Sequence, residues 1–126
     1  MGIRVTETIY FVTDIEAARR FYAEQLGFEL VEEAEWGWML FQMDADHQLG
    51  IMAESAWEKD DGDPDGLPVP RIGIKTDDLD AEIRRLTANG IEVAEPTGDE
   101  GGYRSTTFKD PDGNAFHLWE DGTGTL

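Results

Sequence analysis

Three residues of this chain combine a chemically useful side chain with a place inside an expected strand: Glu7, Arg71 and His117. Glutamate and neutral histidine exchange protons readily, so Glu7 as general base and His117 as acid would suit proton transfer next to a carbonyl group. Arg71 would instead bind a carboxylate or phosphate through two parallel hydrogen bonds. Lys75, which strand alternation places on the same face as Arg71, would add a second cation for such an anion. Alternatively, Glu7 and Arg71 form an ion pair with each other and bind no ligand.

The strand that carries His117 follows from the turn Asp110-Pro111-Asp112-Gly113. Proline presets φ at the second turn position and glycine suits the fourth, so strands are expected on both sides. Alternation places His117 on the same face as Trp119 and opposite Phe116 and Leu118. An imidazole at that position either satisfies a hydrogen bond in the core or faces a ligand cleft.

The first half of the chain predicts the order strand, helix and three strands. Residues 7–12 read as a strand, after which Asp14 caps a helix whose apolar residues follow helical spacing and which stops at Gly27. Three further strands are expected at residues 28–32, 36–43 and 48–53.

The second half repeats this order. Residues 71–76 read as a strand, a helix capped by Asp77 or Asp78 stops at Gly90, and strands are expected at residues 91–94, 103–108 and 114–119. The chain is therefore interpreted as a tandem repeat in which Glu7 is equivalent to Arg71, and Gly50 to His117.

The 126 residues suit a single domain with a first module at 5–57, an acidic linker at 58–70, a second module at 71–120 and a short tail at 121–126. The linker contains Asp61-x-Asp63-x-Asp65-Gly66, which resembles the first half of a calcium-binding loop. Its twelfth position is Ile72 rather than glutamate, so a solvated linker is the main interpretation. A calcium-responsive or scaffold role is a third hypothesis.

The composition is strongly acidic: 10 basic residues face 28 acidic ones, for a formal net charge of -18 and an isoelectric point near 4.1. This charge repels nucleic acids and anionic membrane surfaces, so we expect neither as a partner. The acidic residues are spread along the whole chain. Concentrated salt would screen their mutual repulsion, which predicts a halophilic protein. The alternative is an ordinary acidic protein.

The chain has no cysteine, which excludes disulfides and thiolate chemistry. Its first residues lack the apolar core of a signal peptide, and no window approaches the length of a membrane span. We therefore expect a cytoplasmic protein.

Several motifs stand in a characteristic order along almost the whole chain: Tyr10-Phe11-Val12-Thr13-Asp14, Phe21-Tyr22-x-x-x-Leu26-Gly27-Phe28, Thr76-Asp77-Asp78-Leu79-Asp80 with Gly90, Phe108-x-Asp110-Pro111-Asp112-Gly113-Asn114, and Leu118-Trp119-Glu120. In these motifs the chain resembles the vicinal oxygen chelate superfamily, which includes glyoxalase I, bleomycin resistance proteins and extradiol dioxygenases. The resemblance implies an α+β fold in which two tandem βαβββ modules form a curled mixed sheet around a ligand cleft. It also implies a homodimer whose chains pool their modules.

Superfamily members with a metal hold it at four positions, which correspond here to Glu7, Gly50, Arg71 and His117. Glycine offers no side chain, and arginine offers no lone pair and repels a cation. We therefore expect no metal or other cofactor. If a divalent metal (Ni, Co, Mn, Zn or Fe) does bind, the resemblance implies Glu7 and His117 as its protein ligands.

The remaining predicted ligand-binding residues are apolar or aromatic: Phe11, Trp36, Trp38, Met52 and Trp119. With Arg71 and Lys75 they predict a largely apolar small-molecule site with a few polar anchors. The alternative is that these rings belong to the core or to a dimer interface.

Two functions follow from these residues and the resemblance. The first is a metal-free binding protein of the resistance type, which sequesters a flat, partly anionic small molecule. The second is a lyase, isomerase or dioxygenase that uses Glu7 and His117 as an acid–base pair or as partial metal ligands. Gly50 and Arg71 favour the first, whereas Glu7 and His117 keep the second open.

Overall fold

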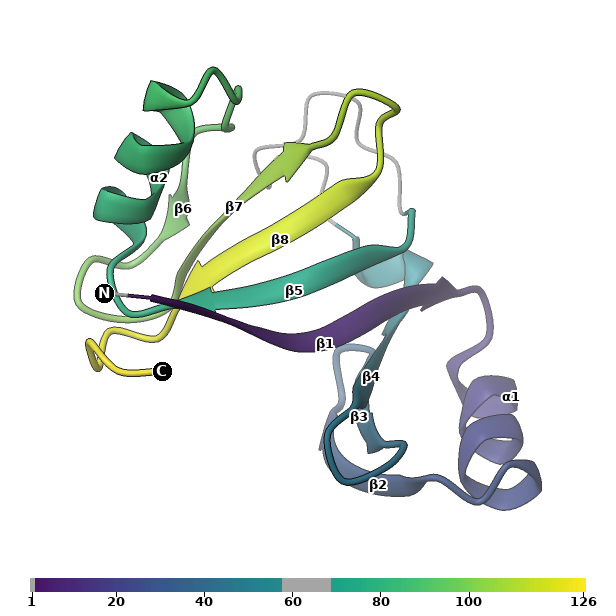
Figure 1. Cartoon of the computed structure of the whole chain (residues 1–126). Coiled ribbons are helices and arrows are strands. Elements are labelled where there is room, and N and C mark those ends of the chain that lie inside the picture. Colours follow the sequence, from purple (N-terminus) through teal and green to yellow (C-terminus); the bar gives the residue numbers. More distant parts are fainter. Residues whose placement is uncertain (1, 58–68) are drawn as a thin grey trace. The chain divides into compact units, whose positions relative to one another are not determined.

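The computed structural model describes residues 2–57 and 69–126 and shows an α+β protein made of two βαβββ modules (Figure 1). The described residues form two compact units, one with residues 7–57, 69 and 70, the other with residues 2–6 and 71–126. Both modules follow the predicted element order, so the α+β fold class is confirmed. Most of the predicted acidic linker, with its calcium-like motif, lies outside the described residues.

The first module consists of β1 (Ile3–Val12), α1 (Ile15–Arg19), η1 (Arg20–Gln25), β2 (Glu29–Ala34), β3 (Trp38–Gln42), β4 (Gln48–Ala53) and the short η2 (Glu54–Ala56). Its strands lie in the order β2-β3-β4-β1. The pair of β1 and β4 is parallel, and the other pairs are antiparallel. The buried core of this module consists of Ala18, Met39, Phe41, Leu49 and Ile51.

The first helical segment begins as predicted and then widens. Asp14 caps α1 by accepting two backbone N–H groups of the first turn, each at 3.1 Å. The following η1 is π-helical, and the Leu26 N–H donates to the Phe21 carbonyl oxygen at 2.8 Å. Phe21 and Leu26, two apolar residues of this helical segment, are 46% and 49% exposed.

The second module consists of β5 (Arg71–Thr76), α2 (Leu79–Ala88), β6 (Thr97–Gly98), β7 (Arg104–Lys109) and β8 (Ala115–Glu120). Its strands lie in the order β5-β8-β7-β6. The pair of β5 and β8 is parallel, and the other pairs are antiparallel. Between the sheet and α2 lies a core of Ile74, Leu79, Leu86 and Leu118.

Two details of the second module refine the sequence predictions. Asp78, rather than Asp77, caps α2 by accepting the Ala81 N–H at 3.1 Å. The strand predicted at residues 91–94 is wrong: Val93 forms one isolated bridge with Phe108, and the second strand of the module along the chain is the two-residue β6. Pro96 has no N–H to donate, so a ladder that starts at Val93 cannot continue through it.

The strand register confirms the internal repeat. In the first module, Ile9 of β1 lies beside Gly50 of β4. In the second, Gly73 of β5 lies beside His117 of β8. Gly50 and His117 therefore occupy equivalent places, as predicted.

Within residues 2–57 and 69–126, no helix is both long and apolar enough to cross a membrane.

Candidate functional site

The face of the second module opposite α2 carries several of the predicted site residues. Parallel pairing places Gly73 beside His117 and Lys75 beside Trp119. Their sequence neighbours point the other way, where Leu118 belongs to the core shared with α2. Alternation in the sequence therefore predicts the correct face for His117, Trp119 and Lys75.

Three rings are stacked on this face. The ring centroid of Tyr103, which precedes β7, lies 6.3 Å from that of His117 and 5.8 Å from that of Trp119. The Tyr103 hydroxyl and His117 Nε2 share a hydrogen bond of 2.6 Å. Tyr103 is 51% exposed, so the stack presents one ring to solvent.

Lys75 is a buried cation at the Trp119 end of this stack. It is 7% exposed, and its Nζ lies 2.8 Å from Asp121 Oδ2 and 5.3 Å from the centroid of the Trp119 ring. One carboxylate and the negative face of one ring therefore compensate the ammonium. Lys75, together with hydrogen bonds from Thr123, holds the pKa of the Asp121 carboxyl far below its usual range.

Arg71 and Thr6 extend the same face. Arg71 is the first residue of β5, lies beside Ala115 of β8 and is 4% exposed. The Thr6 hydroxyl donates to the Gly73 carbonyl oxygen at 3.2 Å and accepts the Trp119 indole N–H at 3.3 Å. Thr6 therefore holds the plane of the indole against which the Lys75 ammonium lies.

A row of aromatic and thioether side chains crosses three strands of the first module. Phe11 of β1 lies beside Met52 of β4, which lies beside Trp38 of β3. Trp57 meets the Phe11 ring edge-on at 5.3 Å between centroids. Trp36, in the turn before β3, stacks on Trp38 at 6.3 Å and is 59% exposed. The structure thus brings four of the predicted ligand-binding residues together in this module.

Gly50 of the first module has no room for a side chain because Trp38 covers it. A Cβ built on Gly50 would lie 2.9 Å from Trp38 Cζ3 and closer still to Cη2. Non-bonded carbon atoms prefer about 3.5 to 4.0 Å. The indole therefore takes the space that a metal-binding side chain would need at this position.

The side chains at the four predicted chelating positions do not fit a divalent metal. Glu7 in β1 and His117 in β8 offer lone pairs, but Trp38 covers Gly50 and Arg71 carries a fixed positive charge. In the described part of the chain, no three His, Cys, Asp or Glu side chains gather into a group that could hold a metal ion. Because the donor set is deficient, we derive no chemical step through a metal.

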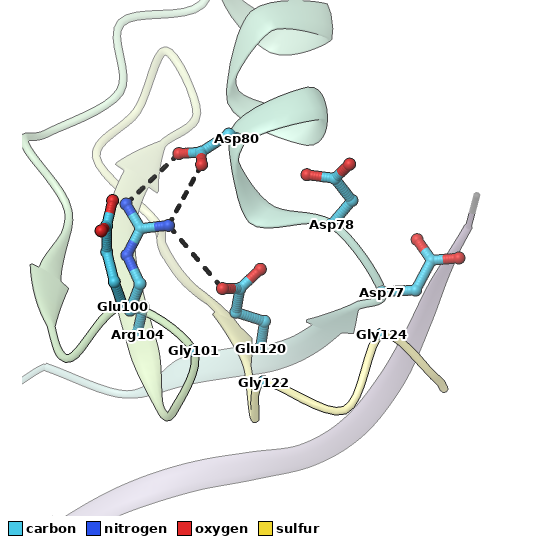
Figure 2. A pocket seen from close by; sticks show the side chains of 9 residues that line it. All are labelled: Asp77, Asp78, Asp80, Glu100, Gly101, Arg104, Glu120, Gly122 and Gly124. Carbon is cyan, nitrogen blue, oxygen red and sulfur yellow. Dashed lines mark hydrogen bonds and ion pairs between the residues drawn. The ribbon is translucent and has the colours of Figure 1, made fainter.

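A separate polar cavity of about 390 Å³ lies at the N-terminal end of α2 (Figure 2). Its lining residues are Asp77, Asp78, Asp80, Glu100, Gly101, Arg104, Glu120, Gly122 and Gly124. The two Arg104 Nη atoms donate to the two carboxylate oxygens of Asp80, each at 3.2 Å. Arg104 Nη1 also lies 3.7 Å from Glu120 Oε2. Asp80 raises the pKa of the Arg104 guanidinium.

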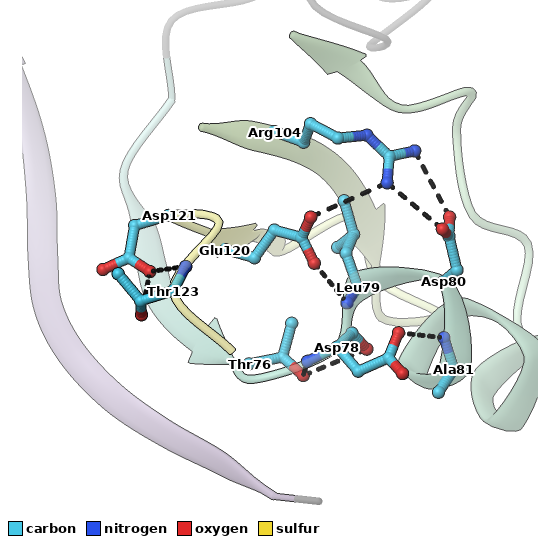
Figure 3. A network of polar contacts seen from close by, with 9 residues as sticks. All are labelled: Thr76, Asp78, Leu79, Asp80, Ala81, Arg104, Glu120, Asp121 and Thr123. Carbon is cyan, nitrogen blue, oxygen red and sulfur yellow. Dashed lines mark hydrogen bonds and ion pairs between the residues drawn. The ribbon is translucent and has the colours of Figure 1, made fainter. Parts of the chain in front are cut away.

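The polar contacts in this cavity join three elements of the second module (Figure 3). Glu120, at the end of β8, accepts the Leu79 backbone N–H of α2 at 2.7 Å through Oε1. Arg104, at the start of β7, contacts both Glu120 and Asp80. The network therefore stabilises the start of α2 against the sheet and has a structural role.

Comparison with known protein families agrees with this arrangement. Residues 4–118 match the model of the family described as the Glyoxalase/Bleomycin resistance protein/Dioxygenase superfamily. The chain belongs to this superfamily. No curated protein matches the chain.

Solved structures of the glyoxalase superfamily share the fold at low sequence identity. A superfamily member from Vibrio splendidus 12B01 is 18% identical, with a TM-score of 0.64 over 95% of this chain and 100% of that chain. Methylmalonyl-CoA epimerase from Mycobacterium tuberculosis is 24% identical, with a TM-score of 0.67 over 93% of this chain and 87% of that chain. The epimerase from Streptomyces coelicolor is 22% identical, with a TM-score of 0.63 over 95% of each chain. At these identities the likeness shows the fold alone.

Four residues of the candidate site were not predicted from the sequence: Thr6, Trp57, Tyr103 and Asp121. The position of Tyr103 could have been found from the sequence. Tyr103 stands two residues before Ser105, and strand alternation places both side chains on the sheet face that carries Trp119. Thr6 lay outside the strand predicted at residues 7–12, because β1 already begins at Ile3. Asp121 follows the last strand, where no periodic pattern indicates a contact.

Proposed function

We propose that this superfamily member binds a flat, partly anionic small molecule on the face of β5, β8 and β7 opposite α2, without a metal and without breaking a bond. The observation that carries this proposal is the Lys75 ammonium, which is 7% exposed and lies against Trp119. Trp119 is stacked in turn on Tyr103, which is 51% exposed. A buried cation recognises an anionic group, and an open ring offers a surface for a planar one.

Charge further supports an anionic ligand. Arg71, 4% exposed on the same face, would add a guanidinium whose geometry suits a carboxylate. The chain has a net charge of -18, yet two buried cations lie on this one face and make the local electrostatic potential more positive there. Phe11, Trp36, Trp38 and Met52 remain predicted contacts for the apolar part of a ligand.

The test is a titration of aromatic carboxylates and their neutral amides, read by tryptophan fluorescence. Lys75→Met removes the charge and keeps an unbranched side chain, so we expect carboxylate affinity to fall by about tenfold or more. Arg84→Met is the matched control, because it changes the net charge equally at an exposed position of α2. Equal carboxylate affinity in Lys75→Met and in the unaltered protein would contradict the proposal.

An enzyme of the lyase, isomerase or dioxygenase kind is the second candidate, and the 2.6 Å contact between Tyr103 and His117 favours it. A phenol and an imidazole at this distance can pass a proton between them. Two similar structures are named methylmalonyl-CoA epimerases, which suggests acyl thioesters as substrates to test. Glu7 remains the predicted base of such a reaction, and Glu7 and His117 remain the predicted ligands if a metal takes part.

Two measurements separate the candidates. Equilibrium dialysis against Ni, Co, Mn, Zn and Fe at high salt measures metal binding, and exchange of the methylmalonyl-CoA α-proton with deuterated solvent measures proton transfer. Near-stoichiometric metal binding that His117→Ala abolishes would favour the enzyme, as would deuterium exchange that Tyr103→Phe abolishes. Aromatic carboxylate binding with neither of these activities would favour the binding protein.

A further inference from the structure

The proposed anion site of this protein already holds a carboxylate, that of Asp121. We propose that Asp121 is an internal competitor, which a monoanionic aromatic carboxylate must displace from Lys75 in order to bind. Asp121 then determines how tightly the site binds anions and which anions it accepts. This inference rests on the proposed binding function and goes beyond it by assigning a ligand class and a specificity-determining residue.

The Lys75 ammonium is compensated by an anionic partner. Lys75 is 7% exposed, and removing the partner of a buried charge is strongly destabilising. In the described part of the chain, the contacts of Lys75 are the Asp121 carboxylate and the Trp119 ring. A ligand carboxylate can therefore take the place of Asp121 without leaving the cation uncompensated.

The two carboxylate oxygens of Asp121 have different partners. Oδ1 accepts the Thr123 backbone N–H at 3.0 Å and the Thr123 hydroxyl at 2.6 Å, as Figure 3 shows, whereas Oδ2 contacts Lys75 at 2.8 Å. The Asp121 side chain is 36% exposed. If Oδ2 turns away from Lys75, it can reach water while Oδ1 keeps its bonds within the C-terminal tail.

The start of the tail is held in place independently of Lys75. Gly122 has a φ of 86° and packs against the loop at Gly101 and Gly102, where an added Cβ would lie 2.9 Å from Gly102 Cα. Displacement of Asp121 is therefore a side-chain rotation and does not require the tail to leave the protein. Asp121 stays close by and competes with the ligand throughout.

The surroundings select the ligand. A carboxylate matches the shape and charge of the group that it replaces. A dianion such as a phosphate ester would meet stronger repulsion from a chain of net charge -18. Tyr103 is stacked on Trp119, which contacts the cation, and at 51% exposure it offers an open ring face, so the carboxylate should be attached to an aromatic ring.

The experiment uses Asp121→Asn and isothermal titration with benzoate and with benzamide. Asparagine keeps an oxygen for Thr123 and removes the negative charge at Lys75. We expect the Kd for benzoate to fall by about tenfold or more and the Kd for benzamide to stay unchanged. Asp112→Asn, an exposed turn residue, changes the net charge equally and should alter neither value.

Stability supplies a second readout in case Asp121→Asn folds weakly. Benzoate should raise the melting temperature of Asp121→Asn more than that of the unaltered protein, and Lys75→Met/Asp121→Asn should lose this effect. If the unaltered protein binds benzoate and Asp121→Asn binds it no more tightly, the competitor role is wrong while the binding function stands. If neither protein binds any aromatic carboxylate, the binding function is wrong and the competitor role fails with it.

Discussion

The pair of Gly50 and Trp38 explains how one residue changes the chemistry of the first module. Gly50 occupies the place equivalent to His117, yet the Trp38 indole lies over it. The indole therefore fills the space beside Gly50 and lies next to Met52 in the apolar row.

At the residue scale we predict that Gly50→Ala destabilises the protein by about 1 to 3 kcal/mol, because its methyl group overlaps the Trp38 ring. Urea unfolding of both proteins measures the loss. In a Trp38→Leu background the methyl group has room, so Gly50→Ala should cost much less there. Equal losses in both backgrounds would show that Trp38 does not fill the space.

At the scale of elements, α2 depends on side chains from outside the helix. Asp78 accepts an N–H of the first turn from its own segment, whereas Glu120 accepts the Leu79 N–H from the end of β8. Arg104 connects Glu120 to Asp80 across the cavity of Figure 2. The start of α2 is thus stabilised by two strands that are distant in sequence.

We predict that Glu120→Ala lowers the free energy of unfolding by about 1.5 to 3 kcal/mol, because it removes a charge-assisted hydrogen bond to a backbone N–H. Glu120→Gln keeps an acceptor and should lose less. The matched control is Glu100→Ala, an exposed acid in the same cavity, which should change stability by less than about 0.5 kcal/mol. Chemical denaturation of the three variants measures these differences, and equal effects at positions 100 and 120 would refute the capping role.

At the scale of the whole molecule, the dominant property is charge. The chain carries a net charge of -18, and many of its acids are exposed, including Glu16, Glu24, Glu29, Glu32 and Asp112. Repulsion among such groups opposes the compact state. Salt shortens the range of that repulsion from about 10 Å at 0.1 M to about 3 Å at 1 M.

We predict that the melting temperature rises steeply between low and molar KCl, because screening removes repulsion that is strongest in the folded state. Differential scanning calorimetry over a KCl series measures the rise. Caesium chloride at the same ionic strength should act alike if screening is the cause. A melting temperature that does not depend on salt would contradict the prediction of a halophilic protein.

The residue pattern alone determined the local elements of this protein and their repetition. Asp14 as a helix cap, β4 at Gln48–Ala53, β5 at Arg71–Thr76 and the face of His117 all follow from short-range signals. The turn at Asp110 follows as well, because its carboxylate accepts two backbone N–H groups of its own loop. Caps, turns and alternation act within a few residues, so a sequence displays them directly.

The tertiary structure decided which partners the site residues have. Lys75 meets Asp121, His117 meets Tyr103, and Trp38 covers Gly50 only once the strands have paired. The π-helical turn of η1 is equally a product of folding. These contacts join residues far apart along the chain or depend on the orientation of one ring. The spacing of residues within a short segment predicts neither. The face of Lys75, His117 and Trp119 was therefore predictable, whereas the partners that give these residues their chemistry were not.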